Sequence, residues 1–592
     1  MKYIDEKYKD EHPEKTVDRI IKKLNSIEIY LDEKYNDSGI ENCHSLRVSV
    51  KGGVPGTNGK GVSKEFARAS GYGEFMERLE SGLFFYKYQS FENDEKVCLQ
   101  SYAYDKKYVT VSELEENGDW MDPIVKKYGV TRKQIAQQCA IYAGSDNILV
   151  VPYYSIFEDK YVYLPTAFVE HIYSANGCCV GNTREEAWVH ALSEILERNA
   201  NIEILKSGKP APIISREKLK RFEVVNNILD KIEKTNKFDV EIFDYSCGRD
   251  FPIIATRIIN RETKGYLVNV GADPIFEIAV QRTLTEIFQG RNIENFSGDK
   301  TGVILKEITD MNISDNILNQ LETGNGIYTV DFFAGDLKSD SEFTDNTGKT
   351  NKQLIEYVLK IYKDIGLPVY VRNYSFLDFP CYKFVVPGFS ESRGERLKEV
   401  ISSYYFGDKC AKTLRNIKCA DKAALTELLM YKNMVANIRS KKFNYNFLAG
   451  LPFNENPPHR LLMHYVYAAY KLNNKKIYDE CLITAISCIT DEKDRDYLLA
   501  IRQWQKFMSD GVKEEVAFKV LERFYFTETI SRLKRNIATD ALFDEFVVEC
   551  IDCKNCRHSN ICQYKNIKKM MTNVGGIYNK FTNGQDKENF MI

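Results

Sequence analysis

The chain of 592 residues is too long for one small core, and its length predicts roughly two to four domains. Its 82 lysine and arginine residues nearly balance 84 aspartate and glutamate residues, so the net charge of -2 gives no field that would attract nucleic acid. The N-terminal segment has no apolar signal core, and no apolar run approaches the roughly 20 residues that cross a bilayer. We therefore expect a cytoplasmic protein that binds neither nucleic acid nor a membrane.

The first two thirds of the sequence alternate between strand and helix patterns. Residues 13–30 have helical periodicity, and residues 45–85 give a short strand, a glycine-rich turn and a long helix. Residues 147–170 have the pattern of strands and lead through a turn into a helix over 182–200. Another strand, turn and helix follow over 265–291, and the segments LPVYVRNYS and CYKFVVPG are extended.

The order of these elements predicts three regions. Residues 1–405 form one α/β domain, which places the chain in the α+β fold class. Strand signals then fade, and residues 406–545 carry successive amphipathic helices in a repeat-like region. Residues 546–592 form a short cysteine-rich tail. The segments GEFMERLE and SEILERNA each place Glu-x-x-Glu-Arg on a helix after a glycine-containing turn, which indicates a duplicated unit.

The predicted helix over 182–200 has an unusual polar flank. At about 100° per residue, Asn182, Glu186, Glu194 and Glu197 fall on one side, while the apolar stripe that includes Trp188 covers the opposite arc. The acidic flank is therefore distinct from the face expected in the core.

The same arrangement recurs on two other predicted helices. The earlier helix carries Ser70, Glu74, Glu77 and Arg78, and the later one carries Arg282, Glu286 and Gln289. Taken singly, each flank has the ion pairs of an ordinary solvated helix. If the three flanks converge, their carboxylates repel one another unless a cation is present. Magnesium would resolve that conflict, since it joins one or two carboxylates to nucleotide phosphates.

The glycine-rich turn GGVPGTNGKG does not match a phosphate-binding loop. Five residues separate Gly53 from Gly59, and Gly61 stands where a serine or threonine would hold magnesium. Lys60 could still reach a phosphate, and a flexible turn between strand and helix explains the segment equally well.

Three segments together resemble the signature motifs of the YcaO family. They are TNGKGVSKEFARASGYGEFMER, GNTREEAWVHALSEILER and ADPIFEIAVQRTLTEIFQGR, in the family's order, and the resemblance spans residues 13–400 with VPG at Val386–Gly388. The helical region after it is similar to that of the long stand-alone subgroup. The resemblance implies a YcaO-type ATP-binding domain that uses ATP and magnesium to phosphorylate a backbone amide oxygen of a peptide or protein, which leads to an azoline or, with sulfide, a thioamide.

The resemblance also assigns roles to individual residues. Glu74, Glu77, Glu194 and Glu197 would form the catalytic magnesium site. The nucleotide would contact Lys9, Thr16, Ser70, Arg78, Asn182, Glu186, Arg198, Glu286, Gln289 and Arg291. Arg291 lies about 140° from Glu286 on an ideal helix, so it reaches the site only if the helix ends near Gly290.

One departure from the family leaves a second hypothesis open. Ring-forming members commonly end in a proline-rich tail, whereas this chain ends in KENFMI. The long subgroup is associated with an accessory role in ribosomal-protein methylthiolation. The alternative is therefore a nucleotide-binding accessory factor or adaptor for a methylthiotransferase or another peptide maturase. A partner that binds a leader segment or delivers sulfur, and a homodimer, are compatible with either hypothesis.

Four cysteines near the C-terminus have the spacing of a metal site. Cys550, Cys553, Cys556 and Cys562 follow the pattern Cys-x2-Cys-x2-Cys-x5-Cys, which lets successive thiolates turn onto one ion. Zinc and an iron–sulfur cluster are the two candidates, and His558 could replace one cysteine. Four unliganded thiols are the alternative.

Two further positions near the polar flank are weaker candidates. His190 lies on the same side as Glu186, and we expect it to hold a neighbour by a hydrogen bond rather than to act in catalysis. Cys178 and Cys179 precede the helix, whose N-terminus could activate a thiol, but burial is the simpler interpretation.

Overall fold

The computed structural model describes most of the chain. The described residues are 9–53, 55–87, 90–92, 95–297, 313–333, 338–339, 341–397, 410–436, 459–550, 556, 559–560 and 562–584. The chain divides into two compact units. Unit 1 comprises Met1–Val400 and Asn566–Ile592, and unit 2 comprises Ile401–Lys565.

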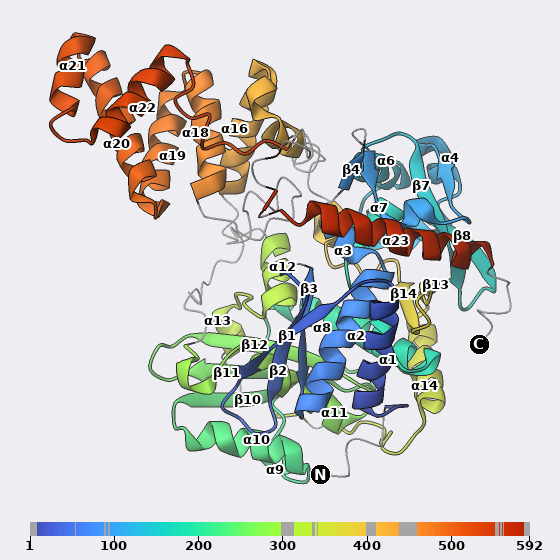
Figure 1. The fold of residues 1–592 in the computed structure, drawn as a ribbon. Helices are drawn as coiled ribbons and strands as arrows, with labels where there is room; N and C mark the ends of the chain where they lie inside the picture. Colours follow the sequence, from blue (N-terminus) through green and yellow to red (C-terminus); the bar gives the residue numbers. More distant parts are fainter. Residues whose placement is uncertain are drawn as a thin grey trace. The chain divides into compact units, whose positions relative to one another are not determined.

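Unit 1 begins with a three-stranded antiparallel sheet and two helices (Figure 1). The strands are β1 (Leu31–Asp37), β2 (His44–Val50) and β3 (Gly56–Gly61), and the helices are α1 (Pro13–Ser26) and α2 (Lys64–Glu80). The glycine-rich segment was expected to be a turn, but it forms β3. A Cβ at Gly59 would overlap the backbone of α2, and one at Gly61 would lie 2.6 Å from the amide nitrogen of Ala67. The glycines therefore let a helix pack directly on a strand.

A second sheet repeats this order of elements. Its antiparallel strands are β10 (Phe238–Asp244), β11 (Ile253–Asn260) and β12 (Tyr266–Ala272), flanked by α10 (Glu223–Lys234) and α11 (Phe276–Ile287). Helix α10 buries Val225, Ile228, Leu229 and Ile232 at the spacing of one helical face. The repeat of helix, three strands and helix thus relates α2 to α11, whereas the sequence echo had suggested α2 and the helix over 182–200.

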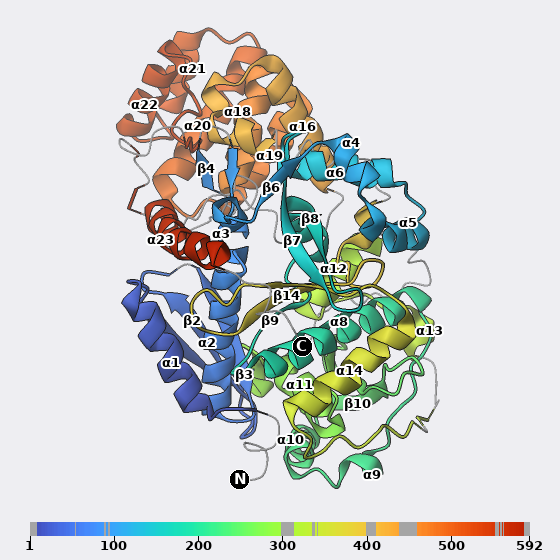
Figure 2. The same ribbon diagram turned by 90° about the vertical axis from the view of Figure 1, so that its right-hand side faces the viewer.

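The third sheet is antiparallel and adjoins a long central helix (Figures 1 and 2). Its order is β6 (Lys107–Val109), β7 (Ile148–Ser155), β13 (Tyr370–Asn373), β14 (Cys381–Val385) and β9 (Cys178–Val180), with β8 (Lys160–Pro165) paired to β7. Helix α8 (Arg184–Ser207) contacts β9 and β14 on this sheet and β12 on the second. Trp188, Leu192 and Ile195 of α8 are buried there. The strands and helices predicted in these regions, and the mixed α/β fold class, are confirmed.

Shorter elements complete unit 1. A small hairpin consists of β4 (Ser90–Glu92) and β5 (Glu95–Val97). The other helices are α3 (Leu83–Lys87), α4 (Val111–Glu116), α5 (Asp122–Tyr128), α6 (Arg132–Ala143), α7 (Thr166–Phe168), α9 (Arg216–Leu219), α12 (Ile313–Thr323), α13 (Val330–Phe333) and α14 (Asn351–Ile365). A turn of π-helix, Val169–Tyr173, follows α7.

The C-terminal helix α23 (Tyr564–Asn583) returns to unit 1. Tyr578 is fully buried and its ring stacks on Tyr374 at 5.7 Å between centroids. Its hydroxyl accepts hydrogen bonds from the guanidinium of Arg372, which also forms a bidentate pair with Asp105. The sequence had grouped residues 546–592 into one tail, but α23 packs with the α/β unit instead.

Unit 2 is helical in its described part, as predicted. Its helices are α16 (Lys422–Ala436), α18 (His459–Lys471), α19 (Lys475–Cys488), α20 (Glu492–Ser509), α21 (Glu514–Leu521) and α22 (Thr527–Ala538). Contacts connect helices that are close in sequence, such as α18 with α19. Burial lowers the pKa of His464 to about 4, and its ring nitrogens lie against backbone groups of Arg460 and Val548. Across both units, the described helices include none that is long and apolar enough to span a membrane.

Candidate active site

The N-terminal end of α8 holds four of the predicted nucleotide contacts in one hydrogen-bonded group. Thr16 on α1 donates from its hydroxyl to Asn182 Oδ1 at 2.7 Å, and Asn182 Nδ2 donates to Glu186 Oε2 at 3.1 Å. Lys9 Nζ lies 3.2 Å from Glu186 Oε1. Burial opposes ionisation of Glu186, but Lys9 and the hydrogen bonds outweigh it and lower its pKa. We call these four residues the Asn182 group.

The second group lies about two to three turns beyond Glu186 on α8, and on α2. Arg78 on α2 lies 2.9 Å from Glu77 and 3.1 Å from Glu74. On α8, Arg198 donates from Nε to Glu194 Oε1 at 2.7 Å. Burial raises the pKa of Glu77 to about 7; Arg78 opposes that effect, while Glu194 and Glu74 add to it. The glutamates of the two helices therefore share one electrostatic environment, as the sequence predicted if the flanks converged.

Glu197 connects α8 to the second sheet. Its Oε2 accepts a hydrogen bond from the amide of Ala272, the last residue of β12, at 2.9 Å. Burial raises its pKa and Glu194 adds to this, while Arg282 opposes it. We call Glu74, Glu77, Glu194 and Glu197 the carboxylate cluster.

Lys60 on strand β3 and Arg282 on helix α11 supply positive charge to the site. Lys60 on β3 forms an ion pair with Glu286 on α11. Burial lowers the pKa of Lys60 to about 8, and repulsion from Arg282 adds to this, while members of the carboxylate cluster oppose it. The Nε atom of Arg282 is buried and has no hydrogen-bond partner. Burial therefore disfavours the charged form of Lys60, and Arg282 has one N–H group that the protein leaves without an acceptor.

His190 and Asp273 lie between the two groups. Burial lowers the pKa of His190 far below its usual value, and Arg282, Lys9 and Lys60 lower it further. Burial raises the pKa of Asp273 to about 6, against the effects of its hydrogen bond to Ile275, of Arg282 and of Lys9. Lys9 from the Asn182 group and Arg282 beside the carboxylate cluster thus act on the same side chains. Sequence reasoning missed Asp273, although its position directly after β12 was a usable signal.

Three predicted residues are less closely connected to this site. Ser70 and Gln289 are half-buried. Helix α11 ends at Ile287, and Gly290 has a φ of 71°. The helix therefore ends near Gly290, which was the condition for Arg291 to reach the site. The Nη1 atom of Arg291 donates to the carbonyl of Ile287 at 3.0 Å.

The arrangement fits a magnesium nucleotide. No three His, Cys, Asp or Glu side chains among the described residues are arranged to hold a metal ion by themselves. Magnesium usually takes only one or two protein carboxylates and completes its shell with phosphate oxygens and water. Burial raises the pKa values of Glu77 and Glu197 and lowers that of Lys60, so a divalent cation beside the acids and phosphates beside the lysine would favour the charged form of each.

Comparison with known proteins identifies the family. The sequence model described as YcaO cyclodehydratase, ATP- and Mg2+-binding, matches residues 58–390, which is more than half of the chain. The chain belongs to the YcaO family. The match begins in β3 and ends after β14, so it includes the carboxylate cluster, Asn182, Glu186, Lys60 and the α11 residues.

Two curated YcaO relatives align over similar lengths. A protein of Haemophilus influenzae that carries no functional name is 26% identical over 65% of this chain and 65% of its own length. The Escherichia coli protein named ribosomal protein S12 methylthiotransferase accessory factor YcaO is 26% identical over 67% of this chain and 70% of its own. The chain therefore spans about two thirds of the relatives it matches.

Solved structures of YcaO proteins resemble this one more distantly. A heterocyclase in complex with substrate and cofactor has a TM-score of 0.44, with 20% identity over 66% of this chain and 55% of that one. YcaO from Methanopyrus kandleri bound with AMPPCP and Mg2+ has a TM-score of 0.41, with 17% identity over 67% of this chain and 95% of that one.

The tail cysteines give no metal site within the described residues. Cys550, Cys556 and Cys562 are half-buried and are not joined in disulfide bonds. Cys553 and His558 lie outside the described residues, so the predicted set of four ligands stays a prediction. Cys178 and Cys179 are buried, and burial raises the pKa of both thiols, which favours packing over activation by the helix N-terminus.

Proposed function

We propose that this YcaO protein uses ATP and magnesium to phosphorylate the oxygen of a peptide backbone amide. The observation that carries the proposal is the set of shifted pKa values among the acidic and basic side chains that α2, α8, α11 and β3 bring to the site. Glu77 there has a pKa raised to about 7, while Lys60 has one lowered to about 8. Burial is the main cause of both shifts, so a divalent cation beside Glu77 and a phosphate beside Lys60 would each favour the charged form of the side chain. The description of the matched family, which binds ATP and Mg2+, agrees with this.

The acidic and the basic residues of the site would have different roles. The carboxylate cluster would hold magnesium, which neutralises phosphate charge when bound. Lys60 and Arg282 would face the phosphates, since burial disfavours the charge of Lys60 and the Nε–H group of Arg282 has no acceptor in the protein. The Asn182 group would fix the nucleotide through Lys9 and the side-chain amide, with Glu186 and Thr16 orienting those donors. Catalysis would rest on positioning and on stabilising charge that develops in transfer.

The chemistry that follows conserves atoms and electrons. The amide oxygen attacks the terminal phosphorus of ATP, ADP leaves, and the amide carbon becomes electrophilic. A thiol or hydroxyl group, or hydrosulfide, then bonds to that carbon, and the original amide oxygen leaves within inorganic phosphate, which takes the S–H or O–H proton. With an attacking side chain the amide N–H proton also passes to solvent, which gives the C=N bond of an azoline ring. With hydrosulfide the N–H proton stays on nitrogen and the product is a thioamide.

A peptide-dependent ATPase assay tests the proposal. ATP hydrolysis should rise when a peptide substrate is added and should fall to background in Glu194→Ala, which removes one carboxylate of the cluster. Glu203→Ala is the matched control, because Glu203 lies on the same helix and also pairs with an arginine, Arg249, but is 44% exposed and outside the cluster. Equal loss in both variants would show that the cluster has no special role.

The accessory role is the second candidate. It is favoured by the name of the Escherichia coli relative and by the separate helical unit, Ile401–Lys565, which offers a surface for a protein partner. Nucleotide binding without turnover, over a set of peptides that includes a fragment of ribosomal protein S12, would support this role over the enzymatic one.

A further inference from the structure

The C-terminal helix α23 packs on two segments of unit 1 that in turn hold the end of α2. The first segment is the 3-10 turn Leu99–Tyr102. The side-chain amide of Asn579 on α23 donates to the carbonyl of Tyr102 at 2.8 Å. A Cβ at Gly575 would lie 2.8 Å from the ring of Tyr102, so the backbone of α23 lies directly against that ring. The turn is therefore held by α23 through both its backbone and a side chain.

The second segment connects β13 to β14. The ring of Tyr374 stacks on Tyr578 of α23 at 5.7 Å between centroids, and the ring of Phe376 lies 5.1 Å from Tyr578. Arg372, on β13, donates two hydrogen bonds to the hydroxyl of Tyr578. Tyr578 is fully buried. One side chain of α23 thus fixes the start of this irregular segment.

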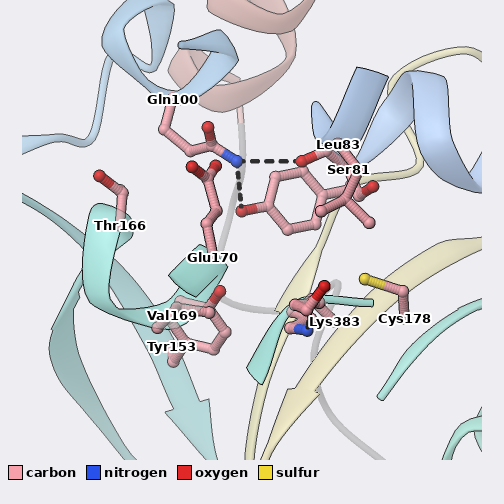
Figure 3. Close-up of a pocket in the computed structure, with 11 residues that line it drawn as sticks. Ser81, Leu83, Gln100, Tyr153, Thr166, Val169, Glu170, Cys178 and Lys383 are labelled. Carbon is pink, nitrogen blue, oxygen red and sulfur yellow. Dashed lines mark hydrogen bonds between the residues drawn. The ribbon is translucent and has the colours of Figure 1, made fainter. Parts of the chain in front are cut away.

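Both segments bond to the C-terminal end of α2. Gln100, in the 3-10 turn, donates from its amide nitrogen to the carbonyl of Ser81 at 3.1 Å and to the hydroxyl of Tyr374 at 3.2 Å, and Figure 3 draws both bonds as dashed lines. The amide of Leu377 donates to Glu80 Oε1 at 2.8 Å. The last carbonyls of a helix have no partner within it, so such bonds hold an end that would otherwise fray.

The end of α2 is one helical turn from the carboxylate cluster. The amide of Ser81 donates to the carbonyl of Glu77 at 3.0 Å, and Glu74 lies three residues earlier on the same helix. An unbroken series of hydrogen bonds and one ring contact therefore joins α23 to Glu77. The residues of this series are each at most 6% exposed: Tyr578, Tyr374, Gln100 and Ser81.

We propose that α23 is a positioning element for the magnesium site, which holds the end of α2 in place and with it the carboxylates of Glu74 and Glu77. Helix α23 acts through α2 and contacts neither metal nor nucleotide. Magnesium demands a nearly ideal octahedral shell at about 2.0–2.1 Å, so a small displacement of α2 would weaken the site. The inference rests on the proposed function for the presence of magnesium.

Two adjacent glycines of α23 provide a matched pair of variants in the full chain. Gly575→Leu should push the helix away from Tyr102, because a Cβ there already overlaps the ring. Gly576→Leu should leave α23 docked, since no atom lies within 4 Å of the corresponding Cβ. Both changes replace a helical glycine with leucine, so they raise helix propensity equally. Hydrogen exchange of the α23 amides, resolved by peptide mass spectrometry, should accelerate only in Gly575→Leu.

Hydrogen exchange in the last turn of α2 measures the link without any ligand. Exchange at Glu77–Ser81 should be faster in Gly575→Leu than in the wild type and in Gly576→Leu. Exchange in α14, which packs on α8 in the same unit, should stay unchanged, whereas a general loss of stability would accelerate it too. Faster exchange in α23 without any change at the end of α2 overturns the proposal. If Gly575→Leu leaves α23 protected, the double variant with Tyr578→Ala also removes the ring contact and is assessed in the same way.

Magnesium titration with a non-hydrolysable ATP analogue measures the functional consequence. The magnesium concentration for half-maximal nucleotide binding should rise roughly tenfold in Gly575→Leu, as is typical of couplings between distant sites, and stay unchanged in Gly576→Leu. A helix that only adds stability would lower the Tm without changing this concentration at a temperature where all variants are folded. An unchanged magnesium requirement in the variant with the undocked helix overturns the proposal. Absence of magnesium-dependent nucleotide binding in the wild type contradicts the proposed function, and exchange at the end of α2 then decides alone on the positioning role.

Tyr374→Phe tests the route of the coupling. The variant loses the hydroxyl that accepts from Gln100 and keeps the ring that stacks on Tyr578, so α23 should stay docked while the magnesium requirement rises by a smaller factor. Combined with Gly575→Leu, the two factors should give less than their product, because both changes interrupt one series of contacts. Factors that multiply fully would contradict the proposed series.

Discussion

Replacing Glu77 with glutamine removes a carboxyl group whose pKa burial raises from 4.5 to about 7. A carboxyl group with a raised folded-state pKa contributes its stability fully below the unfolded pKa and loses it as the pH rises through the folded pKa. Without ligands, the wild type should therefore lose stability between about pH 4.5 and about pH 7 through this group. The difference between the two pKa values corresponds to roughly 3 kcal/mol, which the Glu77→Gln variant should not lose.

Thermal unfolding in the absence of divalent ions measures this difference. Since 1 kcal/mol changes the Tm of a large domain by about 2 °C, we expect Glu77→Gln to melt roughly 5 °C above the wild type at about pH 8. At about pH 5 the two should melt at nearly the same temperature, because Glu77 is then largely neutral in the folded protein. Arg78 keeps its second partner, Glu74, in the variant. Magnesium with a non-hydrolysable ATP analogue should then stabilise the wild type more than the variant.

Comparing the Tm differences at two pH values provides both the control and the result that would contradict the prediction. Glu203→Gln, on α8 but outside the carboxylate cluster, should change the Tm by the same small amount at both pH values. If Glu77→Gln also gave the same Tm difference at about pH 5 and about pH 8, the carboxylate would not be held in an unfavourable environment. The electrostatic basis of the proposed magnesium site would then be wrong.

Three further predictions concern separate parts of the chain. Lys60→Met should weaken ATP binding roughly tenfold, as measured by calorimetry. The affinity of the wild type should decline above about pH 8, where Lys60 loses its proton, and the affinity of the variant should not. Arg372→Met should destabilise unit 1 by about 3–5 kcal/mol in urea unfolding because it leaves Asp105 without its buried partner, whereas Tyr578→Phe should cost only about 1 kcal/mol. Anaerobically purified protein should contain stoichiometric zinc or iron, with a brown colour for an iron–sulfur cluster, and metal-free but fully folded protein would rule out the tail site.

The elements that the sequence predicts well are those whose signal is local. Helix α8 begins after Thr183, whose side chain caps it, and ends before Gly208, which has a φ of 61°. Thr183 is recognisable in the sequence as a start signal, but the predicted helix ended at residue 200, so the stop signal at Gly208 was missed. Strand β3 was missed because the five glycines of GGVPGTNGKG resemble a turn, and the close packing of α2 on Gly59 and Gly61 is revealed only by the tertiary structure.

The packing of α23 with unit 1 also could not be predicted from the sequence. The helix is amphipathic, with Ile567, Met571, Val574 and Tyr578 buried, but its periodicity does not specify what covers that face. Its partners lie far away in the chain: Tyr578 bonds to Arg372, which is 206 residues earlier. Contacts at such separations leave no local pattern.

In the candidate site, too, the sequence predicted the local arrangement on each helix but not the contacts between distant segments. Helical periodicity places Glu74 beside Glu77 and Glu194 beside Glu197, because residues three apart share one face. It does not show that the two pairs meet, and it carries no information on Asp273. That residue directly follows strand β12, where the neighbours in space are set by sheet order rather than by helical spacing.

The electrostatics of the site argue that its arrangement is not a by-product of packing. An ion pair lowers the pKa of its acid and raises that of its base, and Lys9 lowers the pKa of Glu186 in this way. Around the carboxylate cluster the shifts have the opposite direction: the pKa values of Glu77 and Glu197 are raised and that of Lys60 is lowered. Burial is the main cause of all three shifts, so the site holds acids and a base whose charged forms have lost their hydration. A divalent cation beside the acids and phosphates beside Lys60 would stabilise all of these charged forms at once, which a single ion of either sign would not.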